Sequence, residues 1–181
     1  MAKRLDSPYQ AGQRNFNWIK YKASYSATLT DTLDCVLIGY WRGQGKRAAW
    51  GIGALLSAVW DPTDELYKSI ARIGTGYSDA EWLRIREMLD GIAVDERPSN
   101  VCSDIVPDVW VEPEIVVEVL ADELAQSPMH VAGRTERESG LALRFPRVQN
   151  FVREDKESTD ATTVIEVKEM YRRQNERASS E

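Results

Sequence analysis

Runs of apolar residues along the chain predict several buried strands. The first run covers 34–41 (DCVLIGYW), and two more follow at 49–61 and 66–76 on either side of a DPTDE turn. Residues 116–127 predict another strand, whereas 94–115 are rich in proline and acidic residues and are expected to form a loop.

A helical period replaces this pattern after the third strand. Ser78 and Glu81 have the spacing of a capping box, so a helix is expected to begin here and to end at Gly91. Three apolar residues share one face of it: Trp82, Ile85 and Leu89.

A second helix is predicted over about 160–177, because Thr163 and Glu166 repeat the capping-box spacing. Its apolar face carries Val164, Val167 and Tyr171, and its exposed face carries Lys168, Arg172 and Arg173. Strands before a helix and strands after it are typical of a small Greek-key barrel of the OB type, a mainly β fold with α-helices.

The composition limits the number of domains and the classes of protein that the sequence can represent. A chain of 181 residues with 43% hydrophobic content is one globular domain, or one domain with an appendage. A net charge of −6 argues against coating nucleic acid through bulk charge, but it permits a local basic face. The apolar stretch 48–60 is too short to span a bilayer and no signal peptide is visible, so we expect no membrane contact and a cytoplasmic protein, nuclear in a eukaryote.

Cysteine and histidine are too few to suggest a disulfide framework or a zinc site. Cys35 and Cys102 are expected to be small buried side chains, and His130 has no Cys-x-x-Cys near it.

Positive charge is concentrated in three segments, 1–22, 42–47 and 144–156, whereas acidic residues gather in 79–123. We expect the basic segments to converge on one face, with the acidic segment turned away. Such a protein would bind duplex DNA with salt-dependent affinity despite its net negative charge.

The segment WIKYK, 18–22, carries two lysines that share a strand face. Because alternate residues of a strand point to the same side, Lys20 and Lys22 would lie together, and an anion between them would relieve their repulsion. The pattern fits a phosphate clamp, and it also fits a solvated edge strand whose lysines prevent aggregation.

The segment VREDK, 152–156, also suits a phosphate. Arg153 can grip it bidentately and Lys156 adds a second positive charge. Asp155 stands between them, where it could orient either cation or meet a metal-bound water. A charged surface loop is the alternative.

Two other basic segments suggest contact with nucleic acid. In RFPR, 144–147, Phe145 lies between two arginines, which suits a ring wedged against bases, although Phe145 could equally belong to the core. RGQGKR, 42–47, is not a P-loop, because Tyr40 and Arg47 stand where glycine and Ser or Thr are required. We interpret it as a hairpin turn whose tip contacts DNA phosphates.

In their order along the chain, these stretches resemble the C-terminal part of an ATP-dependent DNA ligase of the archaeal and eukaryotic replicative type. WIKYK resembles nucleotidyltransferase motif V, and RFPRVQNFVREDK resembles motif VI. The resemblance covers almost the whole chain and includes SPYQAGQRNFNWIKYK, LDCVLIGYWRGQGKRA, RIGTGYSD, EPEIVVEV and SPMH.

The resemblance implies a nucleotidyltransferase domain joined to an OB-fold domain. Such ligases use ATP and Mg²⁺ to place AMP on a lysine and then on the 5′-phosphate of a nick, from which the 3′-hydroxyl displaces it. The implied nucleotide-binding residues are Lys3, Lys20 and Lys22, and the implied catalytic residues, in a loop that closes over the ATP tail, are Arg153, Asp155 and Lys156. The implied DNA contacts are Arg14, Lys46, Arg47, Arg144, Phe145 and Arg147. The implied partners are nicked duplex DNA, the missing adenylation and DNA-binding domains, and a sliding clamp.

The nucleophilic lysine of this family is absent. It belongs to a Lys-x-Asp-Gly motif, and the one Asp-Gly here, at 90–91, follows Met-Leu. The initial MAK resembles the tail of motif IV. The resemblance thus implies the end of a nucleotidyltransferase domain at 1–23 and an OB-fold domain with its C-terminal helix at 24–181. We expect that this chain cannot adenylylate itself.

Two alternatives use the same residues differently. A free-standing OB-fold module would bind single-stranded DNA on stacked aromatics, for which the candidates are Trp41, Trp50, Trp60 and Tyr67. Their strand positions favour burial in the core, and the lysine and arginine motifs would have no purpose in such a module. An RNA ligase or capping enzyme would share those motifs, but RFPR and the ending DATT…MYRRQ favour a DNA ligase.

Overall fold

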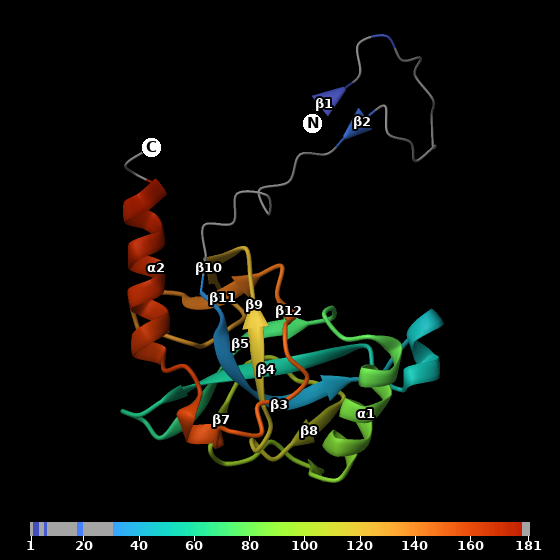
Figure 1. Ribbon diagram of the computed structural model, residues 1–181. Helices are drawn as coiled ribbons and strands as arrows, with labels where there is room; N and C mark the ends of the chain where they lie inside the picture. The colour runs from blue at the N-terminus through green and yellow to red at the C-terminus, as the bar shows by residue number, and fades with distance from the viewer. Residues whose placement is uncertain (1, 4–5, 7–17, 20–30, 179–181) are drawn as a thin grey trace.

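A computed structural model describes residues 2–3, 6, 18–19 and 31–178 (Figure 1). The main body is a curled sheet of eight strands with helix α1 (Asp79–Asp90) and helix α2 (Val164–Ala178) on opposite sides of it in this view. Short 3-10 helices cover Gly45–Trp50 and Ser158–Asp160. The chain is therefore mainly β with a C-terminal helix, as the sequence pattern predicted.

The strand order of the main sheet is β12-β9-β3-β4-β5-β7, and β8 pairs with both β3 and β6. These strands are β3 (Leu33–Trp41), β4 (Ala54–Asp61), β5 (Leu66–Ile73), β6 (Ala93–Val94), β7 (Val101–Cys102), β8 (Val109–Val111), β9 (Val116–Leu120) and β12 (Arg147–Val148). A hairpin of β10 (Glu123–Ser127) and β11 (Gly140–Arg144) packs against β5, and β1 (Ala2–Lys3) pairs with β2 (Trp18–Ile19) in a separate two-stranded sheet.

Strand β3 explains why the sequence shows an unbroken apolar run instead of alternation. Leu33, Cys35 and Leu37 enter one hydrophobic cluster, whereas Val36 and Ile38 enter another on the opposite face. A strand covered on both faces gains nothing from a polar alternate position. Burial also raises the pKa of Cys35 to about 12, so this thiol behaves as a small apolar side chain.

Both capping boxes are confirmed. The Ser78 side chain accepts from Glu81 N while the Glu81 carboxylate accepts from Ser78 N, and Thr163 and Glu166 repeat both bonds. The predicted faces follow: Trp82, Ile85 and Leu89 are buried on α1, and Val164 and Val167 are buried on α2. Within the described part of the chain, no helix has the length and apolar character needed to cross a membrane.

Three predictions about strands were wrong in part. The segment 116–127 is two strands, because the chain turns at Asp122, which is 8% exposed and paired with Arg147. The expected strand at 49–61 begins only at Ala54, since the preceding 3-10 helix ends at Gly51 with a φ of 69°. The expected loop 94–115 contains β7, β8 and the end of β6.

Candidate nucleotide and DNA site

The loop at 151–157 presents two cations to one carboxylate. Arg153 Nη1 lies 3.1 Å from Asp34 Oδ1, and Lys156 Nζ lies 2.5 Å from Asp34 Oδ2. The Asp34 side chain is 16% exposed, whereas those of Arg153 and Lys156 are 26% and 29% exposed. Asp34 therefore holds both cationic groups together at the edge of the barrel, with part of each still open to solvent.

Arg153 has a second carboxylate partner in its own loop. Its Nε and Nη2 atoms donate to the two oxygens of Asp155, each at 2.8 Å. This is the guanidinium edge that grips a phosphate bidentately. The Asp155 side chain is 66% exposed, so of the two carboxylates on Arg153 it is the one that an incoming phosphate can replace.

Backbone hydrogen bonds fasten this loop to the sheet. Arg153 N donates to Val116 O at 2.9 Å, where β9 begins. Asp34, on β3, donates from its own backbone N to Thr162 Oγ1 at 3.0 Å. Gly76 permits the approach of the strand that leads into the loop, because an added Cβ would lie 2.3 Å from Val148 O. The loop is thus held on both of its flanks.

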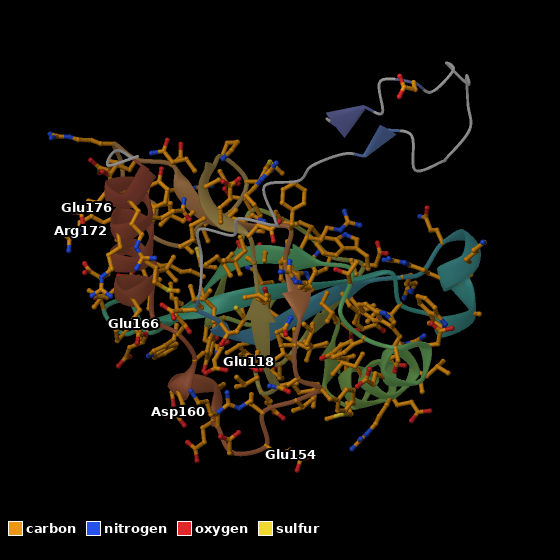
Figure 2. All side chains as sticks on the ribbon, turned by 45° about the horizontal axis from the view of Figure 1, so that its top comes forward. Glu118, Glu154, Asp160, Glu166, Arg172 and Glu176 are labelled. Atoms are coloured by element: carbon orange, nitrogen blue, oxygen red, sulfur yellow. The ribbon has the colours of Figure 1, made fainter. Side chains whose placement is uncertain are left out.

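Arg153 and Asp155 both stay charged across the neutral pH range. Hydrogen bonds from Arg153 lower the pKa of Asp155 to about 2, and those bonds together with the charge of Asp34 raise the pKa of Arg153. Glu118 on β9 adds negative charge near Arg153. Glu154 points outward into solvent at the end of the loop (Figure 2). Arg153 therefore lies among three carboxylates: Asp34, Asp155 and Glu118.

The RFPR segment places its aromatic ring in solvent. Phe145 is 65% exposed and follows the end of β11, so the alternative that it belongs to the core is wrong. Its φ is 54°, a left-handed conformation that is unfavourable for a bulky residue. The guanidinium of Arg144 lies 5.4 Å from the ring centroid. An exposed ring and a cation held on a strained turn suit an external ligand better than packing.

The expectation that the acidic segment 79–123 turns away from the basic segment 144–156 is wrong. Arg147 Nη1 lies 2.9 Å from Asp122 Oδ1, and Asn150 Nδ2 donates to Glu118. Both acids belong to the segment that was expected to turn away. They meet the basic segment because β9 pairs with β12, which precedes the loop.

The second half of the 42–47 segment belongs to the 3-10 helix Gly45–Trp50, whose two cations differ in role. Lys46 is exposed, whereas the half-buried Arg47 donates to the carbonyls of Gly53 and Gly74. Thr75, which follows Gly74, accepts through its backbone carbonyl from Val148 N at 3.0 Å. Through Gly74 and Thr75 the turn that carries Arg47 therefore lies near the 144–156 segment. Arg47 therefore has a structural function that the sequence did not indicate.

Four of the sequence-predicted residues cannot be placed. Arg14, Lys20 and Lys22 lie outside the described residues, as does the side chain of Lys3. Among the residues that the structure describes, no three His, Cys, Asp or Glu side chains gather in a metal-binding arrangement. We therefore assign no Mg²⁺ ligand here.

Comparison with known proteins decides the family. The family model described as "ATP dependent DNA ligase C terminal region" matches residues 48–156, which include RFPR and the Arg153 loop. This chain belongs to that family.

Similar proteins carry matching names. A probable DNA ligase of Dictyoglomus thermophilum is 60% identical over 174 residues, covering 96% of this chain, and a DNA ligase of Pyrobaculum calidifontis is 40% identical over 176 residues. The chain spans about 30% of the length of these relatives. The ligase domain of LigD from M. tuberculosis has a TM-score of 0.53 at 28% identity, covering 88% of this chain and 45% of that one. The expected resemblance is confirmed, and the family's name implies use of ATP.

Asp34 is the residue of this candidate site that the sequence pattern did not indicate. It lies outside the matched stretch and 119 positions before Arg153. Its one signal was an acid within an otherwise apolar strand, with Leu33 and Cys35 both fully buried beside it. A charge at such a position needs a partner.

Proposed function

We propose that this chain is the C-terminal OB-fold part of an ATP-dependent DNA ligase that seals nicks in duplex DNA. The observation that carries the proposal is the pair of cations on Asp34. Arg153 and Lys156 stand together on one carboxylate, in a loop that the ligase family model matches. Two cations held together at a solvent-exposed edge suit the successive negative charges of a polyphosphate.

In this proposal Arg153 and Lys156 bind the phosphate tail of ATP when the loop meets the adenylation domain. The exposed Asp155 leaves the bidentate edge of Arg153 and phosphate oxygens replace it, while the less exposed Asp34 keeps both cations in place. Their charges neutralise the pyrophosphate that departs as AMP is transferred, which is what phosphoryl transfer chiefly requires of a protein. In the complete enzyme, bound Mg²⁺ would supply further neutralisation of the phosphates.

We also propose DNA contact for the N-terminal part of the basic segment 144–156. Phe145 offers an exposed ring and Arg144 an exposed cation beside it, and Lys46 offers an exposed ammonium on the neighbouring turn. Arg14, Arg47 and Arg147 remain proposed DNA contacts, although Arg47 and Arg147 also bind Gly53, Gly74 and Asp122 within the domain.

We propose the domain organisation from the similarity to the ligase family. Residues 1–23 would close a nucleotidyltransferase domain, in which Lys3, Lys20 and Lys22 meet the nucleotide, and 24–181 would form the OB-fold domain. The proposed partners are the other ligase domains, nicked duplex DNA and a sliding clamp.

The aromatic residues disfavour the single-strand-binding alternative. The centroids of the Trp60 and Tyr67 rings lie 4.8 Å apart with the rings tilted, and Tyr67 is buried.

A chimaeric enzyme tests the proposal. The N-terminal 70% or so of the Dictyoglomus thermophilum relative would be joined to this chain, replacing the 30% that the two share. We expect ATP-dependent sealing of a nicked duplex at a rate within about tenfold of the natural relative, because phosphoryl transfer depends chiefly on positioning that the shared fold retains. A folded chimaera that adenylylates itself but never seals, or never reacts with ATP, would contradict the proposal.

A further inference from the structure

Thr162 lies between strands β3 and β4 at the place where their pairing ends. The pairing of the two strands begins at Val36 and Ala58, and the same register continued would place Asp34 opposite Trp60. Thr162 is bonded to both of these residues instead. Its backbone N donates to Asp34 O at 2.9 Å, and its carbonyl accepts from Trp60 N at 3.1 Å. Thr162 is thus inserted into the sheet beside the residue that holds the two cations of the loop.

The side chain of Thr162 makes a further bond to Asp34. Its Oγ1 accepts from Asp34 N at 3.0 Å, so both backbone groups of Asp34 are bonded to this one threonine. On the other edge of β3, Asp34 lies opposite Glu118 of β9. The backbone that carries the Asp34 carboxylate is therefore fixed from both sides, and on the β4 side a threonine hydroxyl takes part in fixing it.

The connection between Thr162 and the loop is held along its length. The 3-10 helix Ser158–Asp160 joins Lys156 to Thr162, and the side chain of its first residue accepts at 2.6 Å from Tyr67 OH. Lys156 at one end of this connection and Thr162 at the other end both contact Asp34. The loop that carries the cations and the segment that follows it therefore converge on one acidic residue.

We propose that Thr162 is a positioning residue for binding of the ATP tail: it fixes Asp34, whose carboxylate in turn holds Arg153 and Lys156 at the spacing that the phosphates need. The inference rests on the proposed nucleotide function of the loop. Thr162 belongs to the DATT ending of the sequence, which favoured a DNA ligase without indicating a role for its residues. Small displacements of charged groups matter here, because phosphoryl transfer depends chiefly on positioning.

The neighbouring Thr163 provides a matched control for a purely structural role. Its Oγ1 accepts from Glu166 N at 3.2 Å and donates to the Glu166 carboxylate at 2.8 Å, as the cap of α2. Loss of either hydroxyl removes a hydrogen bond to a backbone N–H and lowers stability. Only loss of the Thr162 hydroxyl frees the backbone of Asp34.

The test measures self-adenylylation of the chimaera described above as a function of ATP concentration. Thr162→Val removes the acceptor, and we expect kcat/KM for ATP to fall about threefold to tenfold, the value of one hydrogen bond. Sealing of a pre-adenylylated nick should be unchanged, because the ATP tail has already left. Thr162→Ser keeps the acceptor and should stay within about twofold of the unaltered chimaera. Thr163→Val should lower the unfolding temperature but leave kcat/KM unchanged.

Combination with Asp34→Asn shows whether Thr162 acts through Asp34. Adding Thr162→Val to Asp34→Asn should slow self-adenylylation no further, because the charge that Thr162 positions is already gone. Should the valine variant fail to fold, Thr162→Ala also lacks the acceptor and takes its place with the same expectations.

Two kinds of result would contradict these expectations, and they are distinguishable. If Arg153→Ala slows self-adenylylation but Thr162→Val behaves like Thr163→Val, or if the effects of Thr162→Val and Asp34→Asn are fully additive, the inference is overturned and the proposed function of the loop stands. If Arg153→Ala leaves self-adenylylation unchanged, the proposed function of the loop is overturned, and the inference with it.

Discussion

The carboxylate of Asp34 and the ammonium of Lys156 meet at 2.5 Å, although 122 positions separate the two residues in the chain. Arg153 reaches the other oxygen of the same carboxylate. The loop that we propose to bind phosphate is thus held by an acid on strand β3. Asp34 and Asp155 have different exposures, and this difference is what makes one an anchor and the other replaceable.

Replacing the anchor should cost stability. Asp34→Asn keeps the shape of the side chain but leaves two cations without their shared charge, and we expect a loss of about 1–2 kcal/mol after allowing for partial exposure. Chemical denaturation of this chain measures it. Asp64→Asn is the control, because Asp64 is a 50% exposed partner of Lys68, and its loss should stay below about 0.5 kcal/mol. Equal losses would show that Asp34 is an ordinary surface partner.

Two substitutions of Phe145 separate its ring from its backbone. Both Phe145→Ala and Phe145→Gly remove the ring, so both should weaken binding to nicked duplex equally. Glycine adopts a φ of 54° without the strain that alanine would have there. The free energy of unfolding of the glycine variant should therefore exceed that of the alanine variant by about 0.5–1 kcal/mol. Thermal unfolding and DNA titration check the two parts. A glycine variant less stable than the alanine variant would show that this turn is unstrained.

The chain should not accept AMP. Its 181 residues contain no Lys-x-Asp-Gly, so incubation with α-labelled ATP and Mg²⁺ should leave it unlabelled, whereas the chimaera described above should be labelled on its lysine. Stoichiometric labelling of this chain would reveal a nucleophile that the family pattern does not provide.

Acid should destabilise the fold through His130. Burial and the nearby Arg134 lower the pKa of His130 from 6.5 to about 4. Between these values the unfolded chain binds a proton that the folded chain does not, so stability is complete above 6.5 and falls as the pH drops toward 4. The loss is on the order of 3 kcal/mol.

Comparison with His130→Gln isolates this effect from the titration of carboxylates. Denaturation midpoints of the two proteins should converge as the pH falls, because glutamine does not titrate. Parallel midpoints across that range would show that His130 is not the group responsible.

The sequence predicted features that depend on neighbouring residues, but it did not predict pairings between residues far apart in the chain. The helices at Ser78 and Thr163 were predicted because a capping box lies within four consecutive residues. The strands β6, β7 and β8 were missed because two or three residues are too short to show a period. The break at Asp122 was missed because Asp122 pairs with Arg147, which is 25 positions away in the chain.

The candidate site divides in the same way. Arg153, Asp155 and Lys156 were found through one contiguous motif, whose cations could have belonged to any charged loop. Asp34 joins the site only through the register of the sheet, which brings β3 beside β9. No spacing along the chain encodes these contacts.

The central claim is that the Arg153 loop acts on the nucleotide rather than on DNA. Its most direct test measures two steps separately in the chimaera, with Arg153→Ala and with Arg173→Ala as a control on the exposed face of α2. We expect Arg153→Ala to slow self-adenylylation about 10- to 100-fold, the value of one charge-assisted phosphate contact, and to slow sealing of a pre-adenylylated nick far less. Equal loss in both steps would contradict the claim and would assign the loop to DNA docking.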